Sequence, residues 1–191
     1  MSLANEKSLI SELKNGSEKA FKTLVLTYQD RILNTCLGFV PNLQDAEDLS
    51  QEVFVEVYRS VQGFREDAKL STWLYRIAST KCLEYLRNRR RAKRGGLLQI
   101  LSLEKVSVEI PLDHPGIQME QKERAKVLFD SIRRLPDNQA AAVVFSRMEG
   151  LSNKEIASIM DTTVSAVESL LVRAKKNLKT DLTNFFKNEI T

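Results

Sequence analysis

The sequence predicts an all-α protein that consists of two small helical domains joined by a linker. Apolar residues recur at intervals of three and four along most of the chain, which is the period of a helix buried on one side. Only seven glycines and four prolines interrupt the 191 residues, and no alternating strand pattern competes with the helices. The helical period is lost at residues 95–118, so we expect domains at 1–94 and 119–191 with a linker between them.

The N-terminal domain is expected to contain four helices. Gly16 separates a short first helix from a long second one, and Pro41 ends the second. Ser71 is the expected N-cap of the fourth helix, because a serine oxygen can accept a hydrogen bond from a first-turn N–H. The predicted helices run from about Glu6 to Leu13, from Ser17 or Glu18 to about Val40, from about Leu43 to Ser60, and from Thr72 to about Arg91.

The C-terminal domain is expected to be helical from its start. Prolines and glycines break the linker, where a short helix is expected around Leu97 to Leu103. Helices are then predicted from about Glu120 to Arg134, and from Pro136 as the first helical residue to near Gly150.

Two short helical patterns follow one another directly between Leu151 and Leu178. Ser152 and Glu155 form a capping box that begins the first helix. The polar residues Asp161 to Thr163 then form a turn, and Thr163 is the expected cap of the second helix. In the second helix the expected buried residues are Val167, Leu170, Leu171, Ala174 and Leu178, and the opposite face carries Ser165, Glu168, Ser169, Val172 and Lys176. This pattern is typical of a helix-turn-helix that reads the DNA major groove, although an ordinary helical hairpin shares it.

Charge is distributed unevenly along the chain. The sequence has 29 Lys and Arg against 25 Asp and Glu, a net charge of +4 that does not by itself identify a nucleic-acid-binding protein. In the third predicted helix Asp45, Asp48, Glu52 and Glu56 lie along one edge. Such an edge is poorly suited to DNA and favours a basic protein surface as its partner.

The fourth predicted helix has the opposite character. It ends in the basic run LRNRRRAKR. A competing interpretation of part of this run is structural, since basic residues at the end of a helix complement the helix dipole. The aromatic residues Phe64, Trp73 and Tyr75 lie just upstream. Positive charge beside aromatic side chains is what a protein needs to bind single-stranded nucleic acid, although core packing is the competing interpretation for Phe64 and for Trp73.

Several function classes are disfavoured. No apolar run is long enough to span a membrane, and the start of the chain lacks the layout of a signal peptide, so a cytoplasmic protein is expected. Cys36 and Cys82 lie on apolar helical stripes and are expected in the core. The single histidine, His114, has no companion ligands, so we expect no metal, no cofactor and no catalytic activity.

Two long blocks of the chain resemble bacterial sigma factors of the extracytoplasmic-function (ECF) group. The first comprises DAEDLSQEVFVEVYRSVQGFR and STWLYRIASTKCLEYLRNRRR, and the second is RLPDNQAAAVVFSRMEGLSNKEIASIMDTTVSAVESLLVRAKKNL. The resemblance extends from about Glu6 to Lys187, with the blocks in the family's order. It implies an N-terminal domain similar to sigma region 2 and a C-terminal domain similar to sigma region 4.

The resemblance also implies partners. Core RNA polymerase, through its β′ and β subunits, and promoter DNA would bind the chain, which would be a monomer in isolation. Whether an anti-sigma factor also binds is left open. The segment that resembles the one docking on the β′ clamp contains Asp45, Glu47, Asp48, Gln51, Glu52 and Phe54.

Two DNA-binding sets follow from the same resemblance. The loop from Phe64 to Leu70 would accept an extruded base of the minus-ten element. Minus-ten contacts are implied for Phe64, Arg65, Lys69, Trp73, Tyr75, Arg76, Thr80, Glu84, Arg87, Asn88, Arg89 and Arg90. Minus-thirty-five contacts are implied for Thr163, Val164, Ser165, Ala166, Glu168, Ser169, Arg173 and Lys176.

The sequence departs from its relatives at a few of these positions. Thr80 and Glu84 stand where many relatives have Asn and Asp, and Asp161, Glu168 and Leu170 stand where a basic residue or glycine is frequent. Asp161 can adopt the left-handed turn that glycine favours.

Two other function classes compete with a sigma factor. A one-component regulator would bind duplex DNA through the helix-turn-helix and hold a ligand in the N-terminal domain. An enzyme acting on nucleic acid would use Asp45, Asp48 and Glu52 to hold magnesium, but these acids lie on one exposed edge without a partner group.

Overall fold

The computed structural model describes residues 3–94 and 119–189, and within these ranges it contains helices and no strand. The expected short helix at 97–103 and His114 lie outside the described residues. The N-terminal half consists of α1 (Leu3–Lys14), α2 (Glu18–Leu37), α3 (Leu43–Ser60), the short 3₁₀ segment η1 (Val61–Gly63) and α4 (Leu70–Arg94). The C-terminal half consists of α5 (Met119–Arg134), α6 (Asp137–Val143), the π-helical segment η2 (Val144–Met148), α7 (Asn153–Ile159) and α8 (Val164–Glu189).

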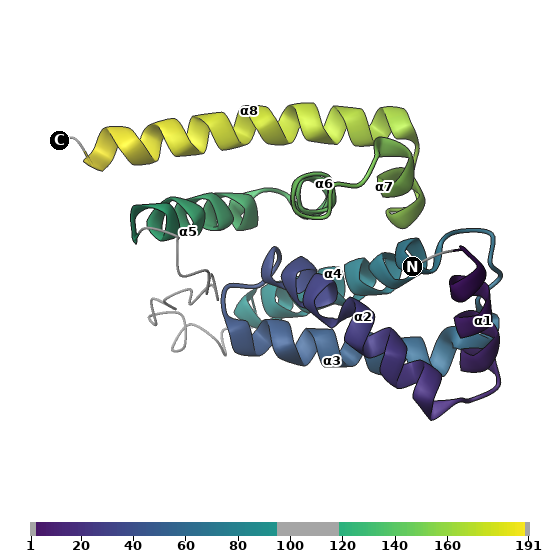
Figure 1. Cartoon of the computed structure of the whole chain (residues 1–191). Coiled ribbons are helices and arrows are strands. Elements are labelled where there is room, and N and C mark those ends of the chain that lie inside the picture. Colours follow the sequence, from purple (N-terminus) through teal and green to yellow (C-terminus); the bar gives the residue numbers. More distant parts are fainter. Residues whose placement is uncertain (1–2, 95–118, 190–191) are drawn as a thin grey trace.

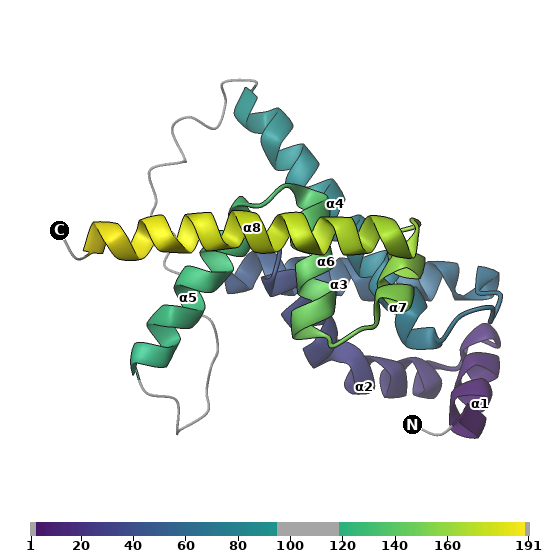
Figure 2. The ribbon, with the colours of Figure 1, turned by 90° about the horizontal axis from the view of Figure 1, so that it is seen from above.

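The two halves are stacked in layers. Helix α8 runs along one side of the molecule, α5, α6 and α7 lie beneath it, and α1 to α4 form the opposite side (Figure 1). Seen from above, α8 passes over α6 and reaches past the N-terminal helices at its C-terminal end (Figure 2). None of the helices in the described ranges is long and apolar enough to cross a membrane.

Helix boundaries agree with the predictions where the capping group is close in the sequence and differ where it is distant. Helix α3 has the predicted bounds, with Asn42 capping it by accepting from the Asp45 N–H at 2.7 Å. Helix α4 begins at Leu70, so the expected cap, Ser71, lies inside its first turn. The Leu70 N–H instead donates to a carboxylate oxygen of Glu6, which belongs to α1. A capping group contributed by another helix leaves no local pattern, and the predicted start of α4 was therefore wrong by two residues.

Other boundaries also differ from the predictions: α1 begins at Leu3 rather than near Glu6, and α4 continues to Arg94 rather than ending near Arg91. Helix α2 ends at Leu37, three residues before the predicted end, and the Gly38 N–H closes its last turn on the Asn34 carbonyl. Pro136 occupies the N-cap position of α6 rather than the first helical position. The one-residue difference at Pro136 lies within the usual variation of a helix end, whereas the predicted end of α2 was wrong by three residues.

The core of the N-terminal half lies between α2, α3 and α4. Ala46, Leu49, Val53 and Val57 of α3 are all buried, as their spacing predicts. Cys36 and Cys82 are both fully buried free thiols, with their sulfur atoms 3.8 Å apart. The expectation that both cysteines pack in the core is confirmed.

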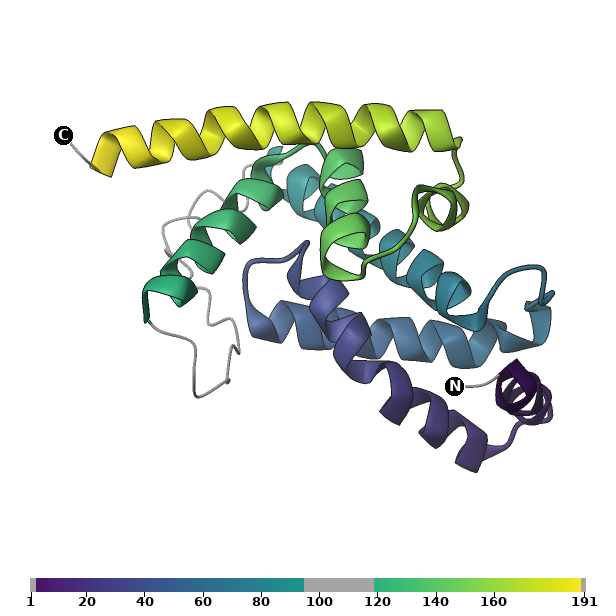
Figure 3. The ribbon, with the colours of Figure 1, turned by 45° about the horizontal axis from the view of Figure 1, so that its top comes forward.

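This core continues into the C-terminal half. Phe145 of η2 is fully buried, with its ring centroid 6.4 Å from that of Phe39 and 6.0 Å from that of Tyr75. Figure 3 shows the segment that carries Phe145 next to the end of α2 and the side of α4. The two halves therefore share one continuous apolar cluster.

Candidate nucleic-acid interface

Helix α4 and the loop before it present the basic and aromatic side chains that the sequence suggested for DNA. Arg65, Lys69 and Arg76 are exposed, as are Arg87 and Arg90 further along the helix. A surface depression of about 400 Å³ lies against α4 and is lined by Glu56, Ser60, Trp73, Arg76, Ile77, Thr80, Lys81 and Glu84. Thr80 and Glu84, which depart from the family pattern on this helix, both line the depression.

The aromatic residues of this region are held by packing. The rings of Phe64 and Trp73 lie 4.9 Å apart, and Phe64 is buried while Trp73 is only partly covered. Tyr75 is 2% exposed, and its hydroxyl donates to a carboxylate oxygen of Glu149 at 2.5 Å. Of the three aromatic residues, Trp73 is the one whose ring lines the depression.

The acidic edge of α3 is open to solvent. Glu47, Asp48, Gln51 and Glu52 are exposed, whereas Phe54 is 8% exposed and packs in the core. Lys81 of α4 lies 3.4 Å from Glu56, at the C-terminal end of this edge.

Asp45 is held in place at the start of the acidic edge. Its carboxylate accepts hydrogen bonds from the Tyr85 hydroxyl at 2.6 Å and from the Asn42 amide at 2.8 Å. Burial and, second, the hydrogen bond to Asp45 raise the pKa of Tyr85 to about 12. Asp45 therefore links the acidic edge of α3 to the basic helix α4.

The helix-turn-helix is confirmed in its details. Ser152 and Glu155 form both hydrogen bonds of the capping box, and Thr163 Oγ1 accepts from the Ala166 N–H at 3.2 Å. Asp161 has a φ of 52°, the left-handed conformation that glycine favours. Lys69 and Ser152 donate hydrogen bonds to the Glu155 carboxylate. These bonds, of which the one from Lys69 has the larger effect, lower the pKa of Glu155 to about 2.

Helix α8 buries one side and exposes the other. Val167 and Ala174 are fully buried, while Leu170, Leu171 and Leu178 are partly buried. Residues predicted for the minus-thirty-five set lie mostly on the opposite side, where Thr163, Val164, Ser165, Glu168, Ser169, Arg173 and Lys176 are exposed and Ala166 is partly covered. The first turns of α8 thus present a continuous polar surface.

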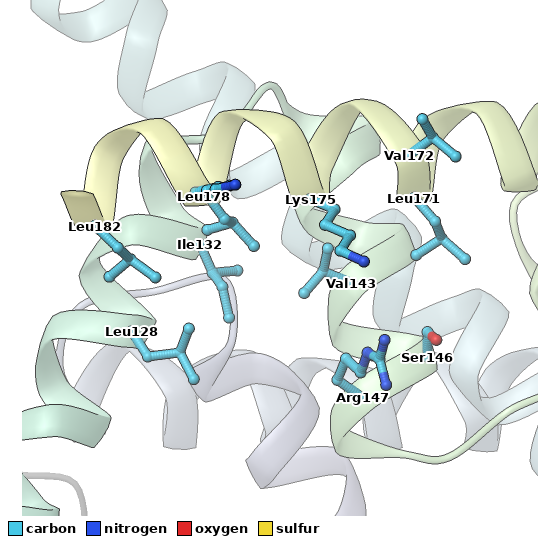
Figure 4. Close-up of a pocket in the computed structure, with 11 residues that line it drawn as sticks. Leu128, Ile132, Val143, Ser146, Arg147, Leu171, Val172, Lys175, Leu178 and Leu182 are labelled. Atoms are coloured by element: carbon cyan, nitrogen blue, oxygen red, sulfur yellow. The ribbon is translucent and has the colours of Figure 1, made fainter. Parts of the chain in front are cut away.

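An apolar groove lies between α8, α5 and α6, and sequence reasoning did not identify it. Its volume is about 600 Å³, and Leu128 and Ile132 of α5 face Leu178 and Leu182 of α8 across it (Figure 4). Arg147, Lys175 and Lys179 line the same groove. The leucines of α8 recur at helical spacing, but the sequence does not reveal that α5 leaves them partly uncovered.

Histidine, cysteine and carboxylate side chains do not gather anywhere in the described ranges in a group of three that could hold a metal ion. Asp45, Asp48 and Glu52 therefore do not form such a group.

Comparison with known protein families identifies both halves. The sequence model of Sigma-70 region 2 matches residues 24–92, and that of Sigma-70 region 4 matches residues 126–178. The ECF RNA polymerase sigma-E factor of Haemophilus influenzae is 32% identical over 177 residues, which cover 91% of this chain and 93% of that protein. This chain belongs to the ECF sigma factors.

Other relatives agree with this assignment. The sigma-E factor of Escherichia coli K12 is 32% identical over 171 residues, covering 88% of this sigma factor and 89% of the relative. Among solved structures, the sigma factor RpoE of Bartonella quintana, in complex with the anti-sigma factor NepR, superposes with a TM-score of 0.67 at 20% identity, covering 86% of this chain and 98% of that one. CnrH, in complex with the cytosolic domain of CnrY, gives a TM-score of 0.66 at 22% identity, covering 94% and 97%. The two structures share the all-helical fold.

The family assignment decides between the classes that the sequence left open. As a sigma factor, the protein directs RNA polymerase to promoters at transcription initiation. The alternative of a one-component regulator is overturned, because the matches to regions 2 and 4 and to ECF relatives cover both halves of the chain.

Proposed function

We propose that the two halves of this sigma factor divide promoter recognition between them. Residues 1–94 form a domain that binds core polymerase and opens the minus-ten element, and residues 119–191 form a domain that reads the minus-thirty-five element. Residues 95–118 connect them. The separation of charge between α3 and α4 is the observation that carries this proposal.

The acidic edge of α3 docks on core polymerase. Asp48 and Glu52 are exposed and lie in a surface depression whose lining also includes Gln51 and Glu56. Exposed carboxylates steer association toward a basic protein surface and repel a phosphate backbone. The proposed docking residues are Asp45, Glu47, Asp48, Gln51, Glu52 and Phe54, with Phe54 supporting the edge from the core.

The basic face of α4 holds the separated non-template strand at the minus-ten element. Exposed arginines can neutralise phosphates, and Trp73 offers a partly uncovered ring on which a base can stack. The depression along α4 is large enough to take part of an extruded nucleotide. The phosphate backbone is bound by the polar and basic residues Arg65, Lys69, Arg76, Arg87, Asn88, Arg89 and Arg90. Trp73, Thr80 and Glu84 line the pocket, whereas Phe64 and Tyr75 are buried, so they support this region from the core rather than contact DNA.

The first turns of α8 enter the major groove at the minus-thirty-five element. Ser165, Glu168 and Ser169 are exposed on one side of the helix, where they can reach base edges. Arg173 and Lys176 follow on the same exposed side and can bind the phosphate backbone. Thr163, Val164 and Ala166 complete this surface at the start of the helix.

The apolar groove of the C-terminal half receives a helix of the polymerase β subunit. Its floor is made by leucines and Ile132, and its basic rim favours a partner that carries acidic residues beside large apolar ones. Since two structural neighbours were each solved with a protein partner, we infer that an anti-sigma factor also binds this chain. The protein would act in the cytoplasm, as a monomer before it binds polymerase, without metal or cofactor and by binding rather than by catalysis.

A run-off transcription assay tests the proposal. Purified core polymerase is mixed with this sigma factor on DNA from its own upstream region and on a pool of genomic promoters. New transcripts that share a pair of upstream elements are expected, and polymerase alone is the control. Absence of new transcripts, together with no detectable binding to core polymerase, would contradict the proposal.

A further inference from the structure

The basic face of α4 is in contact with acidic residues from the C-terminal half of the same chain. Three cations from the proposed minus-ten set each lie beside a carboxylate of α6, α7 or the turn after α7. The pairs are Lys69 with Glu155 at 2.9 Å, Arg76 with Asp161 at 3.5 Å and Arg90 with Asp137 at 2.5 Å. Arg90 donates from both terminal nitrogens to both oxygens of its partner, as an arginine does to a phosphate.

These ion pairs place a carboxylate beside each cation, but they do not by themselves hold the two halves together. The side chains of Lys69, Arg76 and Arg90 are 66%, 52% and 52% exposed. Exposed pairs of this kind contribute little to stability, because solvent screens them. Each pair places a carboxylate against a cation that the proposed function assigns to the DNA backbone.

Apolar packing holds the two halves of the chain together. Val144 and Phe145 of η2 are fully buried against the N-terminal half. Gly38, at the end of α2, permits the close approach, since a Cβ at this position would lie 2.6 Å from Val144 Cγ2. The buried Tyr75 also donates to Glu149, which accepts a second hydrogen bond from Thr35 at 3.0 Å.

The remaining functional surfaces are left free by this contact. Asp48 and Glu52 on α3 are exposed, as are Ser165 and Glu168 on α8. Polymerase can therefore dock on α3 while the two halves are still in contact. The minus-ten face is therefore the proposed DNA-binding surface whose cations are paired with carboxylates from the other half of the chain.

We propose that the carboxylates of Asp137, Glu155 and Asp161 act as an intramolecular mimic of the DNA backbone, which keeps the minus-ten face closed until the two halves separate. This inference rests on the proposed function, because it takes the basic face of α4 as the surface that holds the DNA strand. It adds that the isolated sigma factor is closed to single-stranded DNA by its own C-terminal half.

Neutralising the three carboxylates tests the mimic in the full-length chain. The variant Asp137→Asn/Glu155→Gln/Asp161→Asn is compared with a control that removes the same amount of charge, Glu12→Gln/Glu18→Gln/Asp30→Asn. The three control carboxylates are exposed and form no ion pair among the described residues. Binding to a fluorescent twenty-nucleotide oligothymidine is measured by anisotropy over a series of salt concentrations.

The salt dependence reports how many cations reach phosphate. Each phosphate contact to a single strand adds about 0.7 to the slope of log affinity against log salt. Three freed cations should therefore steepen the slope of the neutralised variant by about 2 relative to its control.

A second pair of variants separates the halves without changing charge. In Gly38→Ala the new Cβ must displace the fully buried Val144, while the φ of −66° is suitable for alanine. Gly63→Ala is the control, because its Cβ would meet nothing within 4 Å. We expect Gly38→Ala to have a larger radius of gyration in X-ray scattering and a steeper salt slope than Gly63→Ala.

A steeper slope in both test variants than in their controls supports the proposal. Equal slopes in either pair overturn it. The run-off assay separates this failure from failure of the proposed function, since a chain that produces promoter-specific transcripts but shows equal slopes is a sigma factor without the mimic.

Discussion

The hydroxyl of Tyr75 donates a 2.5 Å hydrogen bond to a carboxylate oxygen of Glu149, although 74 residues separate the two in the sequence. Burial and, second, this hydrogen bond raise the pKa of Tyr75. The bond joins α4 to the residue that follows η2, and therefore crosses the contact between the two halves of the sigma factor.

Replacing Tyr75 with Phe should lower the free energy of unfolding by about 2 kcal/mol, because a charge-assisted hydrogen bond is lost and Glu149 keeps only Thr35 as a donor. Urea unfolding followed by circular dichroism measures the change. Tyr58→Phe is the matched control, since Tyr58 is 57% exposed and the substitution preserves its ring contact with Phe21. Equal stability of the two variants would contradict the role assigned to Tyr75.

The contribution of Glu155 to stability should depend on pH in the acid range. The folded state lowers the pKa of this carboxyl from 4.5 to about 2, so its ionised form stabilises the fold. The contribution is complete above pH 4.5 and is lost as the pH falls toward 2. The difference in unfolding free energy between the wild type and Glu155→Gln should therefore be constant near neutral pH and shrink below pH 4.5.

Removing the first cause of that pKa shift provides the control. In Lys69→Met the carboxyl keeps its bonds to Ser152 but loses the ammonium donor, so its contribution should be smaller at neutral pH and should be completely lost at a higher pH than in the wild type. The prediction would be contradicted by a difference in unfolding free energy between wild type and Glu155→Gln that stays constant from pH 7 down to the lowest pH at which the protein is folded.

The thiols of Cys36 and Cys82 should be inert in the native protein. Both are fully buried, and the hydrogen bond to Cys36, followed by burial, raises the pKa of the Cys82 thiol well above its usual value. A chromogenic disulfide reagent should react slowly in buffer and label both thiols rapidly in denaturant. Rapid labelling of one thiol in the folded chain would show that α2 and α4 separate locally.

The charges of α3 and α4 should affect different steps of initiation. Arg87→Ala, Arg89→Ala and Arg90→Ala, combined in one variant, should reduce promoter-specific transcription at least tenfold with little change in core binding, since a few lost phosphate contacts cost an order of magnitude or more. Charge reversal at Asp48 and Glu52 should instead weaken the binding of the sigma factor to core polymerase, and any loss of transcription should follow from that weaker binding. Run-off transcription and a core-binding titration on the same preparations distinguish the two effects. Equal losses of core affinity in both variants would refute the division.

Local patterns predicted the helices well where the stabilising groups are close in sequence. The capping box of Ser152 and Glu155 and the cap at Thr163 lie three residues from their partners, and the structure contains them as predicted. The buried stripe of α3 also follows directly from its spacing. The start of α4 could not be found in this way, because its first N–H is bound by Glu6, 64 residues away.

The candidate surfaces were predicted in part. Sequence reasoning placed acids on one edge of α3 and basic residues along α4, and the exposure of Asp48, Glu52 and Arg87 agrees with that placement. It could not tell that Tyr75 points into the core toward Glu149. The groove along α8 was missed as well, since an uncovered leucine and a covered one have the same helical spacing.

Residue types and their spacing were sufficient to predict the helices, the helix-turn-helix and the separation of acidic from basic surfaces. Each of these depends on side-chain type and on interactions within about one helical turn. Only the tertiary structure decided that η2 packs against α2 and α4, and that Lys69, Arg76 and Arg90 face carboxylates of the other half. The physical reason is that these contacts join residues far apart in the chain, and their partners are set by the close approach of the two halves at Gly38.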